Sequence, residues 1–202
     1  MTFGGNRRRS SKRARSADRT DDGPDGPPQP EADPESVARA IVLRRLTMAP
    51  KTRAQLADDL RSRDVPDDVA ERVLDRFSAV GLVDDQAFAQ AWVSSRHTSR
   101  GLARRALSHE LRHRGVGDET VAEAVDAISA EDEWAAARDL VARRLPASRG
   151  LPRETRMRRL AGMLARKGYS GGLAMAVVRD ALATEGVFVT DEAEIDLQLP
   201  TP

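Results

Sequence analysis

The chain has 202 residues and a formal net charge of +1; 32% of its residues are charged and only 3% are aromatic. It contains no cysteine, which excludes disulfide-stapled scaffolds and thiolate metal sites and fits a reducing cytoplasm. No stretch approaches the roughly 18 consecutive apolar residues of a membrane-spanning helix. We therefore expect a cytoplasmic protein without membrane contact, whose core consists mainly of Leu, Val, Ile and Ala.

The first segment, residues 1–34, is basic and then acidic. Its cations lie between Arg7 and Arg19, its carboxylates lie between Asp18 and Asp33, and Pro and Gly crowd its second half. Such a segment buries too little apolar surface to fold, so we predict a disordered tail. A basic arm that contacts nucleic acid, a eukaryotic import signal and a plain solvated tail are all compatible with it. It lacks the apolar core of a secretory signal.

Three later stretches share one helical pattern. In each, two leucines four residues apart precede a turn, and a second apolar stripe at helical spacing follows it. The first leucines of the pairs are Leu56, Leu107 and Leu160, so the pattern recurs after 51 and then 53 residues. The turn carries a cation, followed by glycine in the second and third stretches and by Asp64 in the first. This period predicts an internal triplication.

The predicted fold is all-α, with three tandem three-helix repeats that form an elongated or arched array. We place the repeats at residues 35–83, 84–129 and 130–185, followed by an acidic C-terminal tail at 186–202. A unit of about 50 residues buries only a small core and is marginal alone. Neighbouring units should therefore stabilise one another.

Capping residues predict several helix boundaries. The first helix should begin near Pro34 and end at Met48, because a proline follows two residues later. Thr52 is a favourable N-cap for the second helix, and Asp84 or Asp85 is one for the fourth.

Both tryptophans are expected in the core. Trp92 and Trp134 have apolar neighbours at helical spacing, and Trp134 falls within the helix that we predict for residues 131–145.

The chain resembles the RecX family in three motifs: GLVDDQAFA at residues 81–89, LSHELRHRGV at 107–116 and LARKGY at 164–169. Arg96 and Gly101 lie between the first two motifs. The resemblance covers about residues 35–185 and implies tandem three-helix repeats that regulate the RecA recombinase. Asp64 departs from the pattern, since the other two units have glycine there.

The sequence H-E-x-x-H at residues 109–113 matches the motif with which zinc proteases bind their metal. Each residue of a helix turns the side chain by about 100°. His109 and His113 should therefore lie away from Leu107 and Leu111 and face solvent. A catalytic metal needs a dry, shaped cavity, so we predict no metal, no cofactor and no catalysis.

Positive charge is concentrated on the predicted helices of the second and third units. Between residues 138 and 167 there are ten basic residues and two acidic ones. An ordinary solvated helix face and a surface for phosphate or acidic protein groups explain this clustering about equally well. The candidate partner-binding residues are Arg105, Arg112, Arg144, Arg158, Arg159, Arg166 and Lys167.

The family resemblance implies a non-enzymatic, monomeric regulator in DNA repair, recombination and the SOS response. It would bind the RecA–DNA filament in its groove and inhibit ATP hydrolysis and strand exchange, with single- or double-stranded DNA as a further candidate partner. A helix-turn-helix DNA-binding regulator is an alternative for residues 52–69, although Asp67 and Asp68 would repel phosphate there. A scaffold for another protein fits the triplication equally well.

Overall fold

The computed structural model describes residues 33–195, with side chains as far as residue 186. The predicted N-terminal tail as far as residue 32, and residues 196–202 of the predicted acidic tail, lie outside this range. Within it, every regular element is a helix and no strand occurs, as predicted. The helices are α1 (Pro34–Met48), α2 (Arg53–Arg61), α3 (Asp67–Ala79), α4 (Asp85–Arg100), α5 (Arg104–His113), α6 (Asp118–Asp126), α7 (Ala130–Arg144), the short 3-10 helix η1 (Pro146–Ser148), α8 (Arg153–Arg166) and α9 (Gly171–Ile195).

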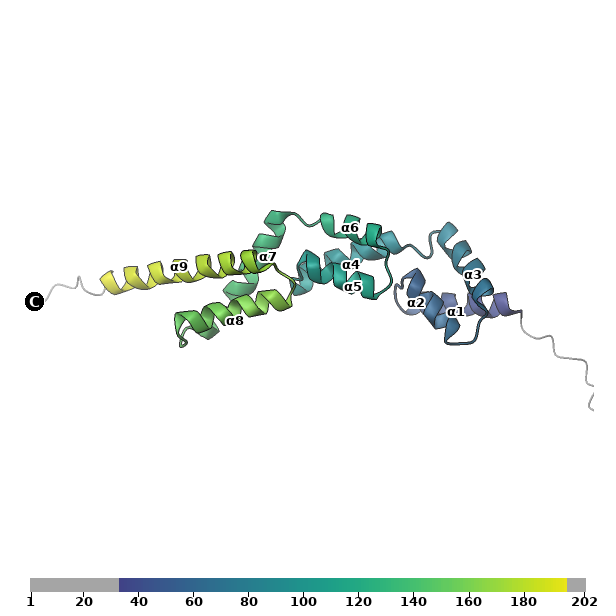
Figure 1. Ribbon diagram of the computed structural model, residues 1–202, viewed down its shortest axis with the longest axis horizontal. Helices are drawn as coiled ribbons and strands as arrows, with labels where there is room; N and C mark the ends of the chain where they lie inside the picture. The colour runs from purple at the N-terminus through teal and green to yellow at the C-terminus, as the bar shows by residue number, and fades with distance from the viewer. Residues whose placement is uncertain (1–32, 196–202) are drawn as a thin grey trace, which may run out of the picture. The chain divides into compact units, whose positions relative to one another are not determined.

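The helices form three consecutive units, α1–α3, α4–α6 and α7–α9, which we call units one, two and three (Figure 1). The predicted leucine pairs lie at the centres of the packing: all six leucines are buried, with at most 4% of their surface exposed. Each pair belongs to a separate apolar core. The chain is therefore a tandem helical array in which each unit contributes its own small core.

Side-chain caps start the helices where the sequence predicts. Thr52 and Gln55 form a reciprocal capping box at α2, and the Asp84 carboxylate accepts the Ala87 N–H at 2.8 Å at α4. The first helix spans Pro34–Met48, as predicted. α9 continues to Ile195, so its helix runs on into the segment that we predict as an acidic tail.

Units one and two meet where α2 begins. The Thr52 hydroxyl donates to the Arg114 carbonyl oxygen at 2.6 Å, and the Arg53 N–H donates to Asp85 Oδ1 at 2.8 Å. Both acceptors belong to unit two. The first amides of a helix have no partner inside the helix. Asp85 of unit two therefore accepts a hydrogen bond from the Arg53 N–H, which has no acceptor within α2.

Units two and three meet in the same way, where α5 begins. The Ala103 N–H donates to the Lys167 carbonyl oxygen at 2.9 Å, and the Arg104 N–H donates to Glu133 Oε1 at 3.0 Å. Ala103 is fully buried and belongs to the core of unit three. We call this contact set, and its counterpart at α2, the two joints of the array.

Tyr169 reinforces the second joint from inside the core of unit three. Its hydroxyl donates to the Gly101 carbonyl oxygen at 3.1 Å, and burial raises its pKa to about 12. The phenol therefore stays protonated and keeps donating at neutral pH.

A glycine with positive φ lies at the centre of each joint. Gly115 has φ of +78°, and a Cβ there would lie 2.3 Å from the Cβ of Ala54 in unit one. Gly168 has φ of +91°, and its Cβ would lie 2.6 Å from the backbone N of Ala106 in unit two. Asp64 takes the same left-handed conformation at φ of +57° but is exposed, and within the described range no other unit packs against this turn. This explains why unit one tolerates a side chain at this turn.

The prediction that Trp134 is a core residue is wrong. Its side chain is 36% exposed, because the buried residues of α7 begin one turn later, at Ala137. Trp92 is half-buried against the core of unit two, and its indole N–H donates to Glu110 at 2.8 Å.

We predict that Gly168→Ala lowers the melting temperature much more than Gly81→Ala. Both glycines have positive φ, so both variants carry the strain of a left-handed alanine, on the order of 1–2 kcal/mol. Only at Gly168 does the added methyl also meet backbone, whereas nothing lies within 4 Å at Gly81. The overpacking should add about 1–3 kcal/mol. Equal melting temperatures, measured by circular dichroism, would contradict the close approach at the joint.

Candidate partner-binding surface

The candidate residues of unit two lie on α5. Arg105 is exposed and makes no ion pair among the described residues, so its charge faces solvent. Arg112 is also exposed, but its Nε donates to Asp118 Oδ1 at 2.6 Å. An exposed pair of this kind contributes little and opens readily. Arg112 is therefore a weaker candidate than Arg105.

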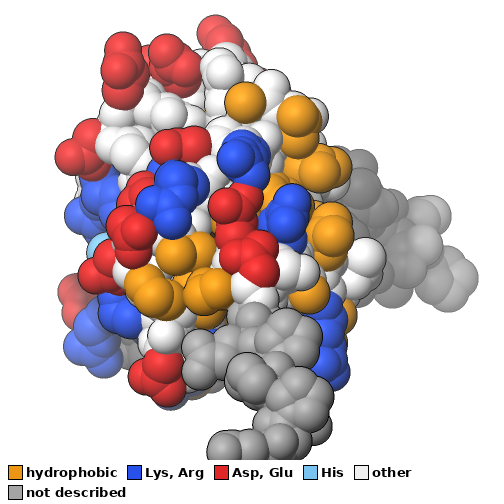
Figure 2. Space-filling view, turned by 90° about the vertical axis from the view of Figure 1, so that its right-hand side faces the viewer, with side chains coloured by type: hydrophobic (Ala, Val, Ile, Leu, Met, Phe, Trp, Pro, Cys, Tyr) orange, Lys and Arg blue, Asp and Glu red, His pale blue; other side chains and the backbone are white. Residues whose placement is uncertain are grey.

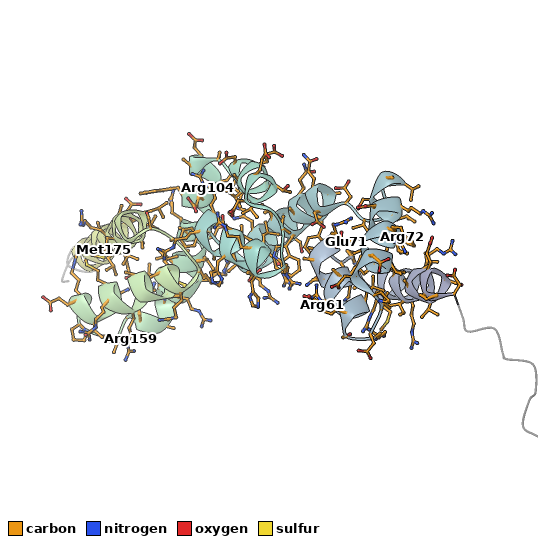
Figure 3. The ribbon with its side chains drawn as sticks, turned by 45° about the vertical axis from the view of Figure 1, so that its right-hand side comes forward. Arg61, Glu71, Arg72, Arg104, Arg159 and Met175 are labelled. Carbon is orange, nitrogen blue, oxygen red and sulfur yellow. The ribbon has the colours of Figure 1, made fainter. Side chains whose placement is uncertain are left out.

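The candidate residues of unit three lie mostly on α8. Arg158, Arg159 and Arg166 are exposed, and none of them pairs with a carboxylate in the part of the chain that the structure describes. Figure 3 shows Arg159 at the edge of α8, with its side chain directed away from the helix. These three cations are available to a partner.

Not every cation of the basic run is available. Arg149, which follows η1, and Arg156 of α8 both form ion pairs with Glu185 of α9. These two ion pairs bring η1 and α8 against α9. Their hydrogen bonds, that of Arg149 first, lower the pKa of Glu185. Only 13% of the Arg156 side chain is exposed. This cluster holds unit three together, and both of its guanidinium groups are engaged by the same carboxylate.

The remaining two candidates, Arg144 and Lys167, are brought together where α4, α7 and α8 end. With Arg100 and Arg143 they line a hollow of about 600 Å³. Arg100 and Arg143 are not among the binding residues predicted from the sequence. The available signal was their position in the last turns of the first helices of units two and three, where cations also serve to complement the helix ends.

A larger hollow of about 870 Å³ lies between α7 and α9. Its walls carry Arg138 and Arg149 beside Asp139, Asp180 and Glu185, so charges of both signs alternate there. The paired Arg149 and Glu185 already satisfy each other. With two cations and three carboxylates in its lining, this hollow does not favour an anion.

The H-E-x-x-H sequence does not form a metal site in the described structure. His109 and His113 are exposed, as helix geometry predicted, and Glu110 instead accepts the hydrogen bond of Trp92. Arg96 and Arg114 lie 4.1 and 3.8 Å from the centre of the same indole ring. No group of three or more metal-ligating side chains occurs within the described residues.

No helix among the residues described is both long enough and apolar enough to cross a membrane.

These features define a tandem helical-repeat protein that presents unpaired cations on its second and third units. Family models for the first, second and third three-helix domains of RecX match residues 38–77, 84–125 and 131–178. The chain belongs to the RecX family.

Similar proteins support this assignment over most of the chain. A protein of Thermobifida fusca is 62% identical over 175 residues, which cover 85% of this chain and 95% of that protein. A protein of Streptomyces lividans is 60% identical over 158 residues, covering 78% and 84%. Both are named Regulatory protein RecX.

Solved structures show the same fold. The crystal structure of RecX from Lactobacillus salivarius superposes with a TM-score of 0.69 at 17% identity, covering 74% of this chain and 97% of that chain. A second crystal structure, of a regulatory protein RecX, has a TM-score of 0.66 at 22% identity and covers 74% and 73%.

We predict that the purified, untagged protein contains no stoichiometric zinc and that a chelator leaves its melting temperature unchanged. The physical reason is that Glu110 is engaged by Trp92 while both histidines face solvent. Elemental analysis and thermal melts check this. Glu110→Gln, which keeps an acceptor oxygen for Trp92, should melt close to the parent protein. A large drop in melting temperature on chelation would revive the metal hypothesis.

Proposed function

We propose that this chain is a non-enzymatic regulator of the RecA recombinase, which binds the RecA–DNA filament in its groove and inhibits ATP hydrolysis and strand exchange. The observation that carries the proposal is the match of all three units to the RecX domains, together with relatives named as regulatory proteins. The RecX resemblance supplies RecA as the partner.

The arrangement of charge supports a filament as the target. Unpaired cations recur on the corresponding helices of units two and three, α5 and α8. A filament repeats the same acidic and phosphate groups along its length, so successive units can engage successive groups. Several weak contacts made by one chain combine through effective concentration into useful affinity. Blocking the groove would then obstruct access of a second DNA.

The α3 helix of unit one offers little to a polyanion. On this helix, the exposed carboxylates of Glu71 and Asp75 pair with Arg53, and Asp68 pairs with Arg72. The face shown in Figure 2 accordingly mixes acidic, basic and apolar side chains rather than gathering cations. Figure 3 shows Glu71 and Arg72 side by side on this unit. These pairs disfavour a helix-turn-helix that would insert α3 into the major groove.

We predict that the double charge reversal Arg105→Glu with Arg158→Glu raises the concentration needed for half-inhibition of RecA by about tenfold or more, since it removes two contacts and adds repulsion. Both side chains are exposed, so helicity should be unchanged. The assay is RecA ATP hydrolysis and strand exchange with substoichiometric amounts of this protein. The effect should shrink at high salt, because exposed charges are screened over about 10 Å at 0.1 M.

The matched control is Arg39→Glu with Arg44→Glu on α1, which changes the net charge equally at two exposed positions. It should inhibit like the parent chain. If the Arg105→Glu, Arg158→Glu variant inhibits RecA as well as the parent chain does, these cations of α5 and α8 only face solvent and do not contact the filament.

A further inference from the structure

The hollow at the junction of units two and three, which we call the junction pocket, collects positive charge from three helix ends. Arg100 is the last residue of α4, Arg143 and Arg144 end α7, and Lys167 follows α8. All four line the same hollow of about 600 Å³. No carboxylate lies among its lining residues.

The four cations are not neutralised by neighbouring acids. None of them forms an ion pair with any described carboxylate. Lys167 donates one hydrogen bond, to the Arg100 carbonyl oxygen, and keeps its charge and its other two donors.

The C-terminal ends of helices attract cations even without a ligand, and this attraction accounts for part of the clustering. Each helix C-terminus carries about −0.5 of an elementary charge, so the three that converge here contribute about −1.5. Four cations exceed that amount by more than two positive charges. Like charges gathered in a hollow repel one another, so the surplus favours an anion held between them.

We propose that the junction pocket binds the backbone phosphate of a single-stranded nucleic acid. Guanidinium and ammonium groups are the donors that proteins use for phosphate oxygens, with arginine able to bond two oxygens at once. Thr98 adds an exposed hydroxyl, which has no hydrogen-bond partner among the described residues. The pocket shares Arg144 and Lys167 with the candidate partner-binding residues, but this contact requires DNA alone and can be measured without RecA.

The floor of the pocket suits the sugar that accompanies each phosphate. Leu102, Leu140 and Met163 form an apolar base beneath the charged rim. A flexible single strand can lead a phosphate and its sugar into such a hollow, whereas a duplex holds its sugars against stacked base pairs. The protein would contact the sugar–phosphate backbone of the strand rather than its bases, so binding should depend little on the nucleotide sequence.

A strand fits the surroundings better than a free nucleotide. The lining contains no aromatic ring on which a single base could stack. On α8, the unpaired Arg159 and Arg166 lie one helical turn before and one after Met163 of the lining, and only a polyanion would use them together with the pocket. The pocket also depends on the second joint, since its walls come from unit two at α4 and from unit three at α7 and α8.

The test measures binding of the full-length chain to a fluorescent oligothymidylate by anisotropy, without RecA, as a function of salt. Arg100→Gln with Arg143→Gln should weaken binding about tenfold at low salt. It should also flatten the salt dependence by about 0.7 in log–log slope, because one phosphate contact on a single strand contributes about that amount. Neither residue belongs to the set proposed to contact RecA, so RecA inhibition is scored separately.

The matched control is Arg39→Gln with Arg44→Gln on α1, which removes the same charge from exposed positions of unit one. It should change affinity less than twofold. Any of three results would overturn the proposal. The two double variants weaken DNA binding equally, the parent chain does not bind the oligothymidylate at low salt, or the parent chain binds duplex DNA more tightly. The proposal would also be overturned if free ATP displaced the labelled strand as effectively as the unlabelled strand does. Circular dichroism confirms that each variant is folded.

Discussion

The N-termini of α2 and α5 hold the array together, because each donates backbone hydrogen bonds to the unit that follows. The Arg53 and Arg104 amides, both first residues of their helices, bond to Asp85 and Glu133 of the next unit. A buried helix-end amide left without an acceptor costs about 1–3 kcal/mol, so the Asp85 and Glu133 carboxylates stabilise the packing of units one and two against the units that follow. The glycine turns fix how closely the backbones approach.

The second joint also assembles the charged surface. It places the end of α4 against the turn after α8, with Tyr169 and Lys167 bonded to the carbonyls of Gly101 and Arg100. The cations at these helix ends therefore line one common hollow instead of lying apart on the surface. The same contacts that stabilise the small cores thus set the spacing of the charges that we propose to act on the filament and on DNA. Stability and binding depend on one arrangement.

Local signals in the sequence were enough for most of the fold. The leucine pairs and the caps at Thr52 and Asp84 act within one or two helical turns, and the structure confirms them. The junction pocket was not predictable in this way, since Arg100 and Lys167 are far apart in the chain and meet only through the joint. Trp134 was misplaced because helical spacing defines a face of α7 but not where along the helix the core begins.

Hydrogen exchange at the first amide of the second helix in each unit tests the joints most directly. Arg53, Arg104 and Arg153 occupy this position in α2, α5 and α8, but among the described residues no further three-helix unit follows unit three. The Arg153 amide has no hydrogen bond among the described residues, and α8 has no side-chain cap. Exchange followed by NMR should therefore be slow at Arg53 and Arg104 and fast at Arg153. Equally fast exchange at all three amides would contradict the joints.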